Sequence, residues 1–101
     1  MNTANLQLEG LLAAIAALNN LLVSKGIVSR GELEKALHVA EATATGDDRL
    51  SELSPANRDA IVFPLRLLRL ANNMASADGV PPFSELARTV GETKQPYNDQ
   101  L

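Results

Sequence analysis

Glu34, His38 and Glu41 are the residues whose types and spacing come closest to those of a metal site. They follow one another at steps of four and three residues, so on a helix their side chains would reach a common patch, as metal ligands on bundle helices do. A bundle site needs further ligands from facing helices, but His38 is the only histidine, and the patch lies away from the apolar Leu33 and Leu37 side of the helix. We therefore expect a solvated helix surface, with no metal and no cofactor. A metal bound by these three residues is the one concrete enzymatic alternative.

No other residues form a catalytic arrangement. A serine or threonine nucleophile would need His38 as its base and an acid to orient the imidazole, and nothing in the sequence places them together. Four serines fall at expected helix ends, where capping accounts for them: Ser24, Ser29, Ser54 and Ser84. The chain has no cysteine, and its six glycines are scattered rather than gathered in a phosphate-binding loop. We therefore expect no catalytic residue and no enzymatic activity.

Arg58, Arg66 and Arg69 form the most suggestive polar pattern, because on a helix they fall along one side. This arginine stripe could bind an acidic partner, an anionic ligand or nucleic acid. The other interpretation is that the arginines pair with carboxylates and keep an apolar helix soluble, the candidates being Glu32, Glu34, Asp59 and Glu85. The net charge of −3 opposes binding to phosphate backbones, so a nucleic-acid partner is not expected.

The elements that must position these residues are predicted to be helices. Hydrophobic residues make up 46% of the 101 residues and aromatic residues only 3%. The core must then consist of leucine, alanine, isoleucine and valine, a mixture that favours helices over strands. The length suits one domain. We predict an all-α fold, a small antiparallel bundle of three long helices and one short C-terminal helix over residues 1–91, with a flexible tail over residues 92–101.

The first helix should run from Asn5 to Lys25 and end at Gly26, which can adopt a left-handed backbone. Its large side chains form one stripe, made of Leu8, Leu11, Ile15, Leu18 and Leu22 and widened by Leu12 and Val23. The opposite side carries mainly small residues, namely Gly10, Ala13, Ala14, Ala17 and Leu21. A helix that is apolar on nearly every side must be surrounded. Either it is the central helix of the bundle, or this small-residue face meets a second copy of the protein.

End signals define a second helix. Ser29 and Glu32 have the spacing of a capping box, so this helix should start near Arg30. Gly46, followed by two aspartates, should end it. Residues 47–53 are then expected to form a polar loop.

The third helix should start at Ser54 and Pro55, which suit the N-cap and first helical positions. Its apolar pattern continues to about Ala77 and should pack against the first helix. Pro64 lacks a backbone donor, so we expect the third helix to be kinked or broken near residues 62–63.

A short fourth helix should follow the turn signals of residues 78–82 and run from Phe83 to Gly91. Residues 83–91 also resemble the first helix and turn of helix-turn-helix DNA-binding domains, with Ala87 and Gly91 at the spacing of that motif. The resemblance implies a recognition helix next, but residues 92–101 include Pro96, so we expect no DNA-reading element. Residues 21–33 resemble a helix-link-helix segment of several bacterial proteins, including the α subunit of nitrile hydratases. That family binds metal through a cysteine cluster that this chain lacks, so the resemblance implies no activity.

The most membrane-like stretch runs from Leu11 to Val23. Asn19 and Asn20 interrupt it, and it is shorter than the roughly 20 apolar residues of a spanning helix. The preceding segment carries Glu9 and neither lysine nor arginine, which is unlike a signal peptide. We therefore expect a cytoplasmic protein without membrane contact.

Excess apolar surface motivates the functional prediction. Each large apolar side chain left in water forfeits roughly 1.5–3 kcal/mol, so several of them would rival a domain stability of about 5–15 kcal/mol. We expect a homodimer that acts as a protein-protein interaction module with an unidentified protein partner. The alternative is a regulatory binder of an anionic ligand or nucleic acid through Arg58, Arg66 and Arg69.

Overall fold

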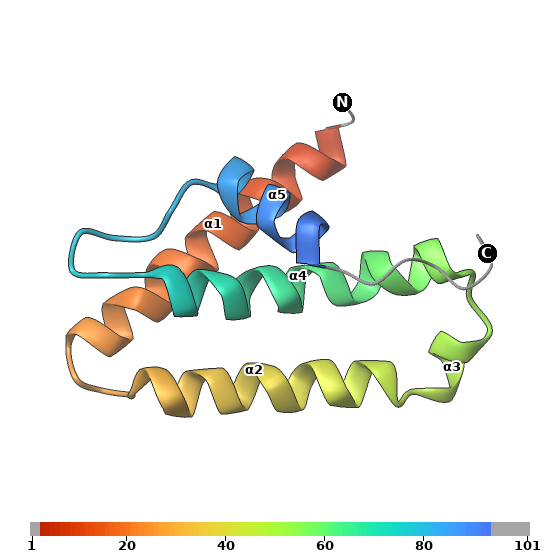
Figure 1. The fold of residues 1–101 in the computed structure, drawn as a ribbon, viewed down its shortest axis with the longest axis horizontal. Helices are drawn as coiled ribbons and strands as arrows, with labels where there is room; N and C mark the ends of the chain where they lie inside the picture. The colour runs from red at the N-terminus through yellow and green to blue at the C-terminus, as the bar shows by residue number, and fades with distance from the viewer. Residues whose placement is uncertain (1–2, 94–101) are drawn as a thin grey trace.

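A computed structural model describes residues 3–93, which contain five helices and the segments that connect them (Figure 1). They are α1 (Thr3–Ser24), α2 (Arg30–Thr45), α3 (Asp48–Ser51), α4 (Pro55–Met74) and α5 (Phe83–Thr93). No strand occurs in this range, so the predicted all-α class is confirmed. The antiparallel order of the long helices stays a prediction.

The C-terminal end of α1 is set by Gly26. This glycine has a φ of +74°, the left-handed conformation in which a Cβ would be strained. The amides of Gly26 and Ile27 donate to the carbonyls of Val23 and Leu22. This is the Schellman pattern of helix ends, and it places the end of α1 one residue before the predicted one.

Side-chain caps start α2 and α3. Ser29 accepts a hydrogen bond from the amide of Glu32, and the Glu32 carboxylate accepts one from the amide of Ser29, so the predicted capping box is present. The short helix α3 lies inside the expected polar loop. Asp47 caps it by accepting from the amide of Arg49, and Leu50 is buried. The loop prediction was wrong here because a local cap and one buried leucine stabilise a helical turn.

The helix α4 begins as predicted, with Ser54 as its N-cap and Pro55 at its start. It continues through Pro64 without interruption, so a break at that residue is wrong. Proline removes one helical hydrogen bond, but Val62 and Leu67, on either side of it, are both buried. Packing of the two halves therefore outweighs the missing bond.

The connection from α4 to α5 is a tight turn. Ser76 and Gly79 exchange two backbone hydrogen bonds, and Gly79 has a φ of +122°. The helix α5 starts at Phe83 as predicted but passes Gly91 and ends at Thr93. Residues 92–93, expected in the tail, are therefore helical, and the rest of the predicted tail, residues 94–101, lies outside the described residues.

The helix α4 is the central element of the fold (Figure 1). It contacts α1, as predicted, and also α2 and α5. In Figure 1, α2 lies beside α4 along its length, whereas α1 runs obliquely to both. The alternative in which the first helix is the central helix of the bundle is therefore wrong.

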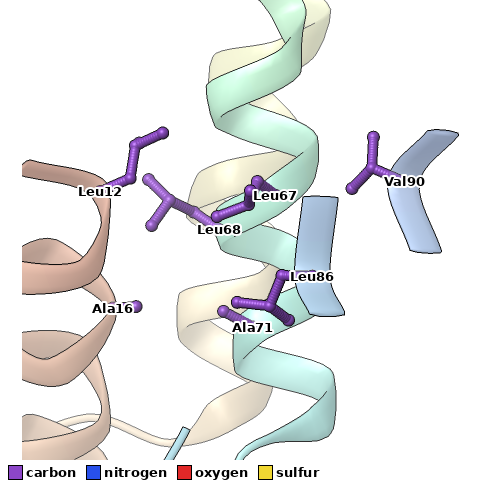
Figure 2. Close-up of a cluster of buried hydrophobic side chains, with 7 residues drawn as sticks. All are labelled: Leu12, Ala16, Leu67, Leu68, Ala71, Leu86 and Val90. Atoms are coloured by element: carbon purple, nitrogen blue, oxygen red, sulfur yellow. The ribbon is translucent and has the colours of Figure 1, made fainter. Parts of the chain in front are cut away.

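Side chains of α1, α4 and α5 form one core (Figure 2). Its buried members are Leu12, Ala16, Leu67, Leu68, Ala71, Leu86 and Val90. From α1 only Leu12 and Ala16 are buried, whereas most of the predicted leucine stripe is exposed, namely Leu8, Leu11, Leu18 and Leu22. Because α1 meets the core through Leu12 and the small Ala16, its other leucines stay exposed.

Candidate functional site

The small-residue face predicted on α1 lies in solvent in the single chain. All five of its members are exposed, namely Gly10, Ala13, Ala14, Ala17 and Leu21. The alternative in which this face packs inside the chain is therefore wrong.

Large apolar side chains lie along the same exposed side of α1. Leu11, Leu18 and Leu21 are 55%, 59% and 51% exposed. Together with Ala14 they follow one another at steps of three, four and three residues, the spacing of the a and d positions of a coiled coil. We call these four residues the α1 seam.

The α1 seam carries no charge. Glu9 is the only charged residue between Thr3 and Ser24, and it is partly buried rather than part of the seam. Gly10 and Ala17 flank the seam with small side chains, which would let another helix approach closely. Exposed apolar patches of a few hundred Å² occur at protein and membrane contact sites.

A groove of about 340 Å³ lies beside α1. Ala13 and Ala17 form part of its wall, together with the turn of residues 79–82 and with Phe83 and Leu86 of α5. No charged side chain lines it. The structure thus divides the predicted dimer face, because these two alanines border the groove whereas Ala14 and Leu21 belong to the α1 seam.

By length and composition alone, α1 could also cross a membrane. It has 22 residues, and an 18-residue window of it has a mean hydropathy of 1.6, so the helix is longer than the apolar stretch from Leu11 to Val23. Core helices and signal sequences have the same properties. Length and composition therefore do not distinguish a membrane helix from a helix of the fold, and the contacts of α1 with the core also matter.

A polar junction of Asn20, Arg30 and Asn72 fixes the C-terminal end of α1 to α2 and α4. Arg30 donates to the side-chain oxygen of Asn20 at 2.8 Å and to the side-chain and backbone oxygens of Asn72 at 3.3 Å. Asn72 is only 5% exposed, and its amide donates to the backbone carbonyl of Arg30 at 3.0 Å. The side-chain amide of Asn20 also donates to the carbonyl of Ser76. Sequence reasoning missed this junction, although an asparagine inside an apolar helix was a signal.

Two of the three stripe arginines bind carboxylates. Arg69 contacts Glu34 at 2.6 Å and Glu41 at 2.9 Å, and Arg66 contacts Glu41 at 3.2 Å and Asp59 at 3.4 Å. Arg58 is partly buried. The contacts to Glu34 and Glu41 join α4 to α2, which contributes no buried residue of its own. An anion that approached Arg66 or Arg69 would have to compete with these carboxylates.

The charges of this network stabilise one another. Burial raises the pKa of Glu41, but hydrogen bonds from Arg69 and Arg66 outweigh burial and hold the pKa below its ordinary value of 4.5. Hydrogen bonds to Glu34 and Glu41 in turn raise the pKa of Arg69. Both Glu41 and Arg69 are therefore charged at neutral pH.

The structure separates the metal candidates Glu34, His38 and Glu41. Both glutamates are partly buried against α4, where Arg69 binds them, whereas His38 is exposed. The expectation that all three side chains lie on a solvated surface was therefore wrong for the glutamates, because α2 packs on α4 through this side. Within residues 3–93, no three histidine, aspartate or glutamate side chains are placed to hold a metal ion.

The segment that resembles a helix-turn-helix motif is part of one continuous helix. No turn occurs at Gly91, because α5 extends to Thr93. Leu86 and Val90 of this segment are buried in the core.

The polar junction and the arginine network hold the helices together, so the α1 seam and the neighbouring groove are the candidate functional surface. No family model, no curated protein and no solved structure matches the chain.

Proposed function

We propose that this chain is a self-associating helical protein-interaction module without catalytic activity, and that two copies associate through the α1 seam. The observation that carries the proposal is the exposure of this uncharged seam on a helix whose other side is anchored in the core. The paired state of Arg66 and Arg69 supports this surface over the arginine stripe as the binding site.

The energetic incentive for association is the unburied leucine surface. Complete burial of a leucine contributes about 1.5–3 kcal/mol, so each half-exposed seam leucine leaves roughly 1 kcal/mol unrealised. A two-fold dimer would bury the same residues of both copies at once. The seam also has the three-four spacing with which helices pack against each other.

The attachment of α1 favours a second copy over a lipid bilayer as its partner. Insertion of α1 would withdraw Leu12 and Ala16 from the core and expose the side chains they cover. It would also break the hydrogen bond between Arg30 and Asn20. Association through the outward side of α1 requires neither change.

Replacing Leu18 with glutamate tests the proposal. Leu18→Glu places a charge in the middle of the α1 seam, where pairing would bury it, and should convert a dimer into a monomer. Because Leu18 is exposed in the single chain, the helical circular dichroism signal should survive. Light scattering at micromolar concentration, without detergent, measures the mass of each species.

Leu6→Glu is the matched control, because Leu6 is a similarly exposed leucine of α1, at 50%, that lies outside the seam. This variant should remain dimeric. A wild-type chain that is monomeric at micromolar concentration, or that floats with phosphatidylcholine vesicles instead of forming dimers, would refute self-association. Equal loss of the dimer in both variants would refute the seam as its surface.

A further inference from the structure

We infer that the second copy docks with its α1 antiparallel to that of the first, so that Leu11 lies opposite Leu21 of the second copy and Ala14 opposite Leu18 of the second copy. This inference rests on the proposed function, because it specifies the partner and the register of the same seam. Its basis is the order of large and small residues along one exposed side of α1, together with Lys25, the residue that follows the helix.

The order of large and small side chains favours this register. In an antiparallel helix pair, each seam residue shares a layer with a different residue of the other copy. Here two layers would combine two leucines, and two central layers would combine Leu18 with Ala14. Large residues opposite small ones fill the space evenly. In a parallel pair, Ala14 would face Ala14 of the second copy and leave a void between two leucine layers.

The ends of the seam favour the same orientation. Continuing the spacing by four residues in each direction leads to Gln7 and Lys25, both exposed. In a parallel pair, the two Lys25 ammonium groups would meet at one end and repel each other. In the antiparallel register, Lys25 lies opposite the uncharged Gln7 of the second copy at both ends. The opposed helix dipoles also favour the antiparallel pair.

Disulfide trapping can test the orientation cleanly because the chain contains no cysteine. Gln7→Cys and Lys25→Cys leave every seam leucine in place. When the two variants are mixed in a redox buffer, one of them enlarged by a tag, the antiparallel register predicts a disulfide between different variants. Each variant alone should form little disulfide, because two copies of residue 7 would lie about 27 Å apart along the helix, far beyond the roughly 7 Å Cα separation that a disulfide spans.

A second pair, Leu11→Cys with Leu21→Cys, keeps Lys25 and so preserves the charge that disfavours the parallel pair. It should also cross-link only as a mixture. Cross-linking of each variant with itself would establish a parallel pair and overturn the inference. The inference would also be overturned if the reduced variants are dimeric by light scattering but neither pair of variants forms a disulfide when mixed. A wild-type chain that is monomeric would instead overturn the proposed function, and the register with it.

Discussion

Arg69 joins α4 to α2 through two carboxylates. It donates hydrogen bonds to Glu34 and Glu41 of α2, and α2 has no fully buried side chain. Leu37 is the residue of α2 that packs, partly buried, against the core. Partly buried ion pairs with several hydrogen bonds therefore contribute a larger share of the binding of α2 than of α1 or α5.

Glu41→Gln should lower the free energy of unfolding by about 1–2 kcal/mol at neutral pH, because it removes the charge that binds Arg66 and Arg69. The folded-state pKa of Glu41 lies below its ordinary value of 4.5. The contribution of this carboxylate is therefore fully present above that value and is lost as the pH falls through the folded-state pKa. Urea unfolding at a series of pH values should show the wild-type advantage shrinking below about pH 4.5.

Glu92→Gln is the control for this experiment, because Glu92 is an exposed helical glutamate. Its effect on unfolding should stay within about 0.5 kcal/mol. An advantage of the wild-type chain over Glu41→Gln that persists unchanged in acid would contradict the assigned role of the ion pairs.

Asn72→Ala should destabilise the fold by about 1–3 kcal/mol, because it leaves buried donors and acceptors of the polar junction without partners. The neighbouring exposed asparagine provides the control, since Asn73→Ala changes helix propensity equally but is placed in solvent. Chemical denaturation of both variants measures the difference. Equal stability of the two variants would mean that the junction with Arg30 contributes nothing.

At the scale of the elements, helix ends with a side-chain cap or a left-handed glycine were easier to predict than helix faces. These ends are set by contacts between neighbouring residues, so the sequence was sufficient to predict them. The examples are Ser29 with Glu32, Ser54 with Pro55, and Gly26. The buried face of α1 was not predictable in the same way, because nearly all of its sides are apolar and periodicity cannot choose among them. Contact with α4 makes that choice, and it buries Leu12 and Ala16.

The continuity of α4 leads to a prediction about Pro64. Pro64→Ala should raise the free energy of unfolding by about 1–2 kcal/mol, because alanine can donate the missing helical hydrogen bond and has a higher helix propensity. The greater flexibility of the unfolded chain reduces this gain. Thermal and urea unfolding measure the effect. A loss of stability would instead indicate that the partly buried proline ring fills a space that alanine leaves empty.

At the scale of the whole molecule, the residues of the candidate site could be predicted from the sequence. Whether those residues are exposed or paired could not. The small residues of α1 and the arginines of α4 were visible in the sequence, each with two interpretations. Which interpretation applies depends on contacts between distant residues, such as Arg69 with Glu34, which are 35 positions apart. No local pattern encodes those contacts, and the three-dimensional arrangement leaves the α1 side open while it pairs Arg66 and Arg69 with carboxylates.

The association of two chains through the α1 seam is the central claim, and sedimentation equilibrium of the unmodified chain tests it most directly. The measurement covers a range of micromolar concentrations in buffer without detergent. We predict a mass that rises with concentration toward twice the 10.8 kDa of the chain. A mass that stays at 10.8 kDa throughout this range would contradict the claim.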